Sequence, residues 1–342
     1  MVRALVLLAV VAGACAPVPV VRSGGPTRYE STRICMGIRA RVVVYARDWP
    51  RAERAMNAAF DTINALDASM SDYRPASEVS RLGHAAGGES LRVSDDLVRL
   101  LARARRLAAM TDGAFDPTAA PASHLWRAAR REGRLPDEAS IEQARALVGW
   151  RDLHIDEAGS RVRLARAGMG IDLGGIAKGY AAQRALDTLR ALGHRAAMVA
   201  LDGDIAVGDP PPGSRGWIVE IAPGTGMSRV LTLVNACVST SGDREQFLAA
   251  DGVRYSHIVD PRTGRALTNV AWATVVADRG EDADALASAA CVLGPTEAKE
   301  ILARVPGVSA IIEADVTGVD GRVTRERVTI DPTGRLRRAG VE

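Results

Sequence analysis

One stretch, residues 168–192 (GMGIDLGGIAKGYAAQRALDTLRAL), constrains the fold of this chain more than any other. It combines an acidic residue, Asp172, with a turn containing Gly174 and Gly175, and a lysine, Lys178, at the start of a predicted helix. Glycine lets the backbone approach a ligand closely, and the free N–H groups at a helix start favour an anion. The stretch therefore predicts a phosphate-binding turn. The alternative is an ordinary strand–turn–helix connection with a solvated lysine.

The helix after this turn is predicted over residues 176–192, because apolar residues recur there at helical spacing. The side chains expected on its buried face are Ile176, Tyr180, Leu186, Leu189 and Leu192. A short strand containing Met169 and Ile171 is expected before the turn.

The composition indicates a soluble globular protein. Of the 342 residues, 47% are hydrophobic and 25% are charged, and the net charge is only +3. A chain of this length can form one large domain or two small ones. Its arginine clusters, such as Arg127, Arg130 and Arg131, lie in helical patterns among alanines and are expected on solvated faces. No basic patch interleaved with aromatic residues is present, which argues against nucleic-acid binding.

The N-terminus has the pattern of a bacterial lipoprotein signal. A short positive segment and an apolar run are followed by Ala-Gly-Ala and then Cys15. We expect a signal peptide over residues 1–14, lipidation at Cys15 and a flexible tether over residues 15–30. The protein would then be exported and anchored to a membrane by lipid, on its periplasmic face or outer surface. The alternative is an ordinary cleaved signal in which Cys15 is incidental.

The rest of the chain mixes helical and strand patterns. Helices are predicted at 49–66, 94–110, 124–133, 139–148 and 282–293. Strands are predicted at 38–45, 196–201, 217–221, 230–234, 271–277, 308–312 and 322–330, with a hairpin over 153–164. A small-residue turn is expected at 239–243. No linker divides the chain, so residues 31–335 are expected to form one domain.

Polar residues gather where predicted elements begin or end. The clusters are Tyr73, Asp116, Asp172 with Lys178, His257 with Asp260, and Asp284 with Ser288. Asp284 and Ser288 are four residues apart and so share one helix face. Their oxygens, with a carbonyl from the glycine turn, suit a hard cation such as Mg²⁺. The alternatives are a solvated helix-end charge at Asp284 and a surface loop at Tyr73.

Eight motifs in order carry a resemblance to a known family. They are Met36-Gly37, MSDYRPASEVSRL (70–82), TDGAFDPT (111–118), IDLGGIAKGY (171–180), LDGDI (201–205), VSTSGD (238–243), YSHIVDPRTG (255–264) and ADALASAACVLG (283–294). With these motifs the chain resembles the ApbE-type FAD:protein FMN transferases. The resemblance implies an α+β fold, with mixed or antiparallel sheets, packed helices and FAD in a cleft. It also implies Mg²⁺-dependent transfer of FMN from FAD to a threonine of a target flavoprotein, with release of AMP. Exported subunits of redox pumps are the acceptors that the family suggests.

The resemblance also assigns residues. The flavin nucleotide would be held by Met36, Tyr73, Ala114, Phe115, Asp116, Asp172, Lys178, His257 and Ile258. Mg²⁺ would lie between the Gly175 carbonyl, Asp284 and the Ser288 hydroxyl. Catalysis would use Lys178 against phosphate charge and His257 as general base, or as a phosphate ligand instead. Asp260 would orient His257 or only cap its own turn.

Three departures from the family pattern stand out. Ile38 and Ser288 each replace a usual threonine, and Asp202 replaces the first of two usual glycines. Two other functions stay open at this point. One is an Mg²⁺-dependent FAD pyrophosphatase that gives FMN and AMP, and the other is a non-catalytic, exported flavin-binding lipoprotein.

Overall fold

The structure is a computed structural model that describes residues 25–221, 229–242, 247–317 and 322–336. The predicted signal peptide and Cys15 lie outside the described residues. The expected tether is wrong at its end, because Thr27–Glu30 already belong to a strand that pairs with its neighbour. That strand is a mostly exposed sheet edge, so its sequence lacks the apolar alternation by which strands are recognised.

The fold is built on one eight-stranded sheet in which every neighbouring pair is antiparallel. Its strands in spatial order are β1 (Thr27–Cys35), β2 (Ile38–Ala46), β6 (Ala197–Leu201), β7 (Asp204–Val207), β10 (Ala236–Gly242), β15 (Ala271–Ala277), β16 (Ser309–Thr317) and β17 (Val323–Ile330). Antiparallel strands and helices packed around them confirm the expected α+β class.

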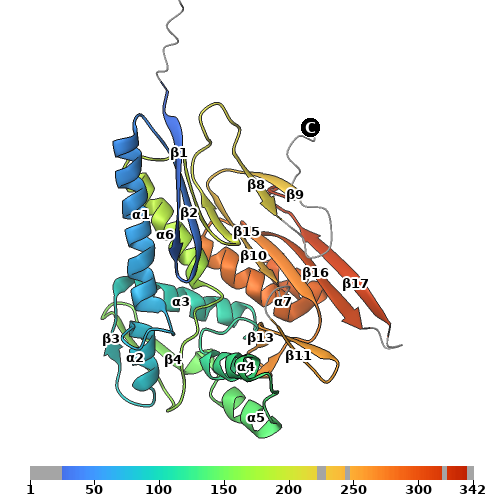
Figure 1. Ribbon diagram of the computed structural model, residues 1–342. Coiled ribbons are helices and arrows are strands. Elements are labelled where there is room, and N and C mark those ends of the chain that lie inside the picture. Colours follow the sequence, from blue (N-terminus) through green and yellow to red (C-terminus); the bar gives the residue numbers. More distant parts are fainter. Residues whose placement is uncertain (1–24, 222–228, 243–246, 318–321, 337–342) are drawn as a thin grey trace, which may run out of the picture.

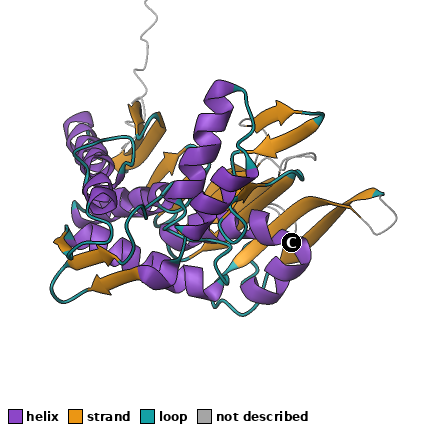
Figure 2. Cartoon of the chain, turned by 90° about the horizontal axis from the view of Figure 1, so that it is seen from below, coloured by secondary structure: helices purple, strands orange, loops and turns teal. Residues whose placement is uncertain are grey.

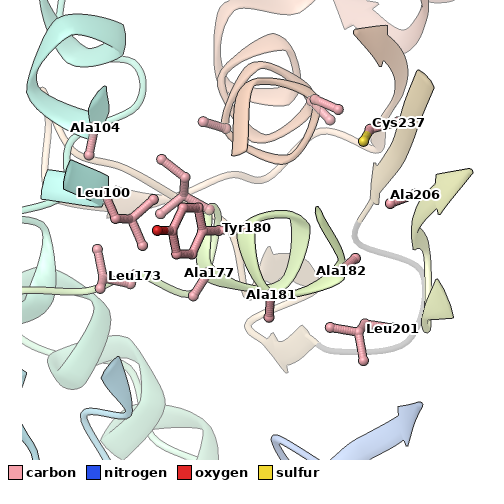
Figure 3. Packing of buried hydrophobic residues seen from close by; sticks show 14 of the residues in the cluster. Leu100, Ala104, Leu173, Ala177, Tyr180, Ala181, Ala182, Leu201, Ala206 and Cys237 are labelled. Carbon is pink, nitrogen blue, oxygen red and sulfur yellow. The ribbon is translucent and has the colours of Figure 1, made fainter. Parts of the chain in front are cut away.

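Three long helices cover one face of this sheet: α1 (Trp49–Met70), α6 (Ala177–Ala191) and α7 (Gly280–Leu302) (Figure 1). They form the main core with the inward side chains of β2, β6 and β15. Figure 3 shows part of this core, in which Tyr180 and Ala181 of α6 lie among Leu100, Leu173 and Leu201. The hydroxyl of Tyr180 donates a hydrogen bond to Asp96 Oδ1 over 2.6 Å, so the buried ring keeps a polar partner.

A hairpin covers the opposite face of the sheet. It consists of β8 (Trp217–Ile221) and β9 (Arg229–Leu233). Trp217 and Leu231 of the hairpin pack with Val43 and Val276 of the sheet in a second core. The sheet is therefore buried on both faces, by helices on one side and by strands on the other.

The remaining helices and short strands lie at one end of the molecule (Figure 1), the end that faces the viewer in Figure 2. The helices are α2 (Glu78–His84), α3 (Asp95–Met110), α4 (Ala120–Glu132) and α5 (Glu138–Ala146). A three-stranded sheet consists of β3 (Leu91–Arg92), β5 (Arg161–Leu164) and β4 (Leu153–Asp156). Two further strand pairs are β11 (Phe247–Ala250) with β12 (Val253–Ser256) and β13 (Val259–Asp260) with β14 (Arg265–Ala266). Trp126 of α4 stacks on Tyr255 of β12, which joins α4 to the strands that carry the histidine motif.

The structure corrects several local expectations. The segment around Met169 and Ile171 is not a sheet strand, since Gly170 makes only an isolated bridge to Ala119. Leu192 is 53% exposed, because α6 ends one residue before it. The expected turn at 239–243 is instead strand β10 up to Gly242, and Asp243 lies outside the described residues.

No helix within the described ranges is both long and apolar enough to cross a bilayer.

Candidate functional site

A cavity of about 440 Å³ opens between the end of α1, helix α4, the glycine turn and the β12–β13 connection. It collects most of the residues that the motifs singled out. Those in its wall are Met36, Tyr73, Ala114, Phe115, Asp116, Asp172, Gly175, Lys178, His257, Ile258 and Ser288. Asp260 and Asp284 do not line it. Six of the eight motifs thus contribute residues to this cavity, which is the candidate site, while the LDGDI and VSTSGD segments do not line it.

The hairpin between β1 and β2 places Met36 at the cavity. Cys35 pairs with Ile38, so Met36 and Gly37 form a two-residue loop, with φ of 53° and 73°. Both values are positive, as in the type I′ turns that fit the twist of antiparallel strands. Ile38, the first departure from the family pattern, also lines the cavity. An apolar side chain therefore stands where a threonine hydroxyl is usual.

The glycine turn is held from both sides. Asp172 Oδ1 accepts the N–H of Gly174 over 2.8 Å, and the N–H of Asp172 donates to the Pro117 carbonyl over 2.9 Å. A Cβ on Gly175 would lie only 2.9 Å from Ser288 Oγ. A side chain at position 175 would therefore force Ser288 to shift, because the Gly175 backbone lies directly against the Ser288 side chain.

The ammonium group of Lys178 is paired with a buried carboxylate. Its Nζ forms an ion pair with Asp204, which is 1% exposed and also accepts a hydrogen bond from the Ser239 hydroxyl. Burial alone would lower the pKa of Lys178, but the negative charges of Asp204 and Asp284 raise it above its ordinary value. The negative charge of Asp202, which replaces a glycine of the family pattern, also raises the pKa of Lys178. Lys178 is therefore a permanent cation.

Asp284 lies beneath the cavity, where helices α6 and α7 meet. Its Oδ2 accepts the N–H of Gly179 over 2.9 Å, and it is 1% exposed. Burial, and then the nearby Asp204, raise its pKa to about 7, while Lys178 partly offsets both. A carboxylate so poorly solvated and so close to another acid favours a bound cation.

The predicted Mg²⁺ ligands fit this geometry. Ser288 follows Asp284 by one helical turn on α7, and the Gly175 backbone touches Ser288. These groups offer oxygen atoms only, which Mg²⁺ prefers. Within the described part of the chain, no three or more His, Cys, Asp or Glu side chains gather in a metal-binding group.

His257 lies between β12 and β13 with its backbone fixed on both sides. The N–H of Ile258 donates to Ser256 Oγ over 3.0 Å, and the Ile258 carbonyl accepts the N–H of Leu267 over 2.9 Å. The imidazole is half-buried in the cavity wall. It is therefore held at the ligand cavity while remaining accessible to it.

Asp260 has the turn-capping geometry. Its Oδ1 accepts the N–H of Arg262 over 2.9 Å and the Arg262 Nε over 3.1 Å. A second guanidinium nitrogen of Arg262 lies 3.2 Å from Oδ2. These contacts use the carboxylate to close the turn that follows β13.

The TDGAFDPT motif forms the cavity wall. Asp116 accepts the N–H and the hydroxyl of Thr118, both over 2.7 Å, and the N–H of Trp150 over 3.0 Å. Its carboxylate is thus engaged in the shape of the turn, and burial raises its pKa. Ala114 and Phe115 are almost fully buried beside it.

The expectation of a solvated arginine face on α4 is wrong for two of the three residues. Arg127 and Arg130 line the cavity, whereas Arg131 is exposed. Arg127 ion-pairs with Asp72, and its Nη2 donates to Asp172 Oδ2 over 3.1 Å. Its guanidinium carbon lies 4.9 Å from the centre of the Tyr73 ring.

Arg127 thereby links the Tyr73 loop to the glycine turn across the cavity. His124 adds to this network through Nε2, 2.9 Å from Asp72 Oδ2. The available signal for these residues was the helical phase of α4. Buried Trp126 and Ala129 define its inner face, and Arg127 and Arg130 directly follow them in sequence.

Comparisons with known proteins show which sequences and folds this chain is similar to. A family model described as the ApbE family matches residues 36–312. The FAD:protein FMN transferase of Treponema pallidum (strain Nichols) is 34% identical over 331 residues, covering 89% of this chain and 91% of that protein. The one from Klebsiella pneumoniae (strain 342) is 31% identical over 246 residues, covering 70% of this chain and 74% of that protein. The apo crystal structure of Pseudomonas stutzeri flavinyl transferase ApbE superimposes with a TM-score of 0.80 at 29% identity, covering 93% of this chain and 99% of that one.

Proposed function

This chain belongs to the ApbE family, and we infer from that membership that it is an enzyme that transfers FMN from FAD to a protein. The structural observation that carries the inference is the single cavity lined by the glycine turn, Lys178 and His257. A binding protein would need a cavity, but it would not need a permanent cation and a titratable base in the same wall.

We propose that the reaction requires Mg²⁺ held by Asp284, Ser288 and the Gly175 carbonyl. When bound, Mg²⁺ neutralises charge on the diphosphate of FAD and on the departing phosphate. The support for this site is the buried Asp284 carboxylate, with its raised pKa, one helical turn from the Ser288 hydroxyl.

The proposed acceptor group is a threonine hydroxyl. Its oxygen attacks the phosphorus on the FMN side of the diphosphate, so that a new O–P bond forms. The P–O bond to the bridging oxygen breaks, and AMP leaves with that oxygen. Lys178 contributes a fixed positive charge at the cavity wall during this exchange.

His257 receives the threonine proton in this proposal. The ordinary pKa of a histidine side chain, about 6.5, lies in the range that suits general-base catalysis at neutral pH. The fixed backbone on either side of His257 supports the role, because a base must be held within hydrogen-bond reach of the proton it removes.

The rival reaction replaces threonine with water and gives free FMN and AMP. Both reactions release AMP, so AMP alone does not distinguish them. The test is to incubate the protein with FAD and Mg²⁺, with and without a threonine-bearing acceptor, and to follow AMP, free FMN and acceptor mass together. Transfer predicts AMP in equal amount to covalent FMN, whereas hydrolysis predicts free FMN whether or not the acceptor is present.

We also propose that Cys15 is lipidated and that the enzyme acts on the exported side of a membrane, on exported redox-pump subunits. The support is the Ala-Gly-Ala-Cys sequence after a short apolar run. Labelling with a fatty acid in a host that processes lipoproteins tests the anchor. The wild type should be labelled and Cys15→Ser should not; equal labelling of the two would remove the proposal.

A further inference from the structure

Arg130 carries a positive charge in the cavity wall that the described protein groups do not neutralise. It lies three residues after Arg127 on α4, and both line the cavity. Arg127 is engaged by Asp72 and Asp172. Among the described residues, no carboxylate forms an ion pair with Arg130, and its Nη1 is buried without a hydrogen-bond partner.

A buried guanidinium nitrogen without a partner is costly, and native proteins seldom leave one so. An anionic ligand against the accessible part of this side chain would compensate the delocalised charge of the guanidinium. Lys178, a further cation in the wall, shares its charge with Asp204. Asp67 in the same wall is paired with Arg74, so it does not neutralise Arg130. The charge of Arg130 is therefore available to an anionic ligand that enters the cavity.

The flavin substrate has one anionic part, which is its diphosphate. The isoalloxazine ring and the adenine are neutral, and the ribityl chain and ribose are polar. A guanidinium matches phosphate oxygens with two parallel N–H donors, and such charge-assisted bonds are stronger than neutral ones. We propose that Arg130 binds a phosphate of the FAD diphosphate and is a specificity-determining residue for phosphorylated flavins. The inference rests on the proposed function and adds a residue that the motifs did not indicate.

The helix offers a matched control. Arg131 is the next residue, has the same chemistry and is exposed. Arg130→Gln and Arg131→Gln remove the same charge from the same helix, but only the first removes it from the cavity. Arg130→Lys keeps the charge but loses the two parallel N–H donors of the guanidinium. Its FAD affinity should therefore lie between those of the wild type and Arg130→Gln.

The test is a binding series with riboflavin, FMN and FAD, measured by flavin fluorescence in Mg²⁺ without acceptor. These ligands share the ring and carry zero, one and two phosphates. Arg130→Gln should weaken FAD binding about 10- to 100-fold, as expected for a lost hydrogen bond to a charged group. Riboflavin binding should change little, and Arg131→Gln should match the wild type throughout. Unchanged riboflavin binding also shows that the variant is folded.

Competition by AMP identifies the phosphate. If FMN binding falls with FAD binding, Arg130 contacts the flavin-side phosphate. If FMN is unaffected and AMP competes less well, it contacts the adenylate phosphate. Unchanged FAD affinity in Arg130→Gln, or an equal loss for riboflavin and FAD, would overturn the inference.

Failure of the proposed function would give a different result. The wild type would then bind FAD through Arg130 but transfer no FMN to protein. A wild type that binds no flavin would overturn both.

Discussion

Gly179 of α6 and Gly280 of α7 lie against each other where the two helices cross. A Cβ on Gly179 would be 2.1 Å from the Gly280 carbonyl oxygen, and a Cβ on Gly280 would be 2.0 Å from the Gly179 carbonyl oxygen. Only glycine permits this approach. The close crossing brings the Gly179 N–H to Asp284, so the helix contact also builds the floor of the candidate site.

Gly179→Ala should therefore destabilise the fold, because its added methyl meets backbone on the other helix. Overpacking of this kind costs at least about 1–3 kcal/mol in the free energy of unfolding. Gly83→Ala in α2 is the control, since its nearest neighbour would be 4.0 Å away and alanine favours a helix by up to about 1 kcal/mol. Urea denaturation compares the two, and a Gly179→Ala protein as stable as the wild type would contradict the crossing geometry.

Asp284 should make Mg²⁺ binding depend on pH. Its pKa is raised from 3.8 to about 7 in the folded protein. A raised carboxyl pKa means that the folded state holds the proton more tightly than the unfolded state. Without metal, this group's contribution to stability is therefore fully present below pH 4 and is lost as pH rises through 7.

Mg²⁺ binds the ionised form, so its affinity should increase as pH rises through 7. Thermal denaturation with and without Mg²⁺ should show a larger increase in Tm at pH 8 than at pH 6. Asp284→Asn should abolish both the increase in Tm and the Mg²⁺-dependent activity. An equal increase at both pH values, or full activity of the variant in EDTA, would contradict the assignment.

Asp204→Asn should leave Lys178 without its counter-charge. Removing one partner of a fully buried ion pair costs roughly 3–5 kcal/mol, and Lys178 is only half-buried, so we expect about 1–3 kcal/mol. The raised pKa of Lys178 means that the pair stabilises the fold at all pH values below the ordinary lysine pKa. Wild-type stability should thus show no loss from this pair between pH 6 and 9.

The control for this pair is Glu142→Gln, which breaks an exposed Arg145 pair on α5. Its effect on the urea midpoint should be much smaller than that of Asp204→Asn, because exposed ion pairs contribute little to stability. Similar urea midpoints for Asp204→Asn and Glu142→Gln would show that Asp204 does not support Lys178.

His257 should matter more for transfer than for FAD binding. His257→Ala removes a general-base contribution of about 10²–10⁴ in rate. FAD affinity should change much less, because Lys178 and the Tyr73 loop remain in the cavity wall. Single-turnover transfer at saturating FAD, measured beside FAD fluorescence over several pH values, separates the two effects. Weakened binding with an unchanged single-turnover rate would make His257 a phosphate ligand instead of the base.

The parts of the site that sequence predicts best are those encoded within one short motif. The turn before α6 uses Gly175 for its close approach to Ser288, and the amphipathic spacing of Tyr180 and Leu189 fixes the helix that follows. Local chemistry determines such features, so they can be recognised without knowledge of the rest of the chain.

Features that depend on distant partners were not predicted. The sequence around Arg127 is typical of a solvated helix face. The ion pairs of Arg127 with Asp72 and Asp172 form only because the fold brings two other segments to it. Asp204 likewise acquires its role only when β7 meets Lys178 on α6. Strand β1 was missed for a related reason: its exposed edge position leaves no apolar alternation in the sequence.

The most direct test of the account is mass spectrometry of a threonine-bearing acceptor incubated with FAD, Mg²⁺ and this enzyme. We expect one covalent FMN on a threonine of the acceptor, one AMP released for each FMN attached, and no attachment when that threonine is replaced by alanine. Release of AMP and free FMN with an acceptor of unchanged mass would contradict it.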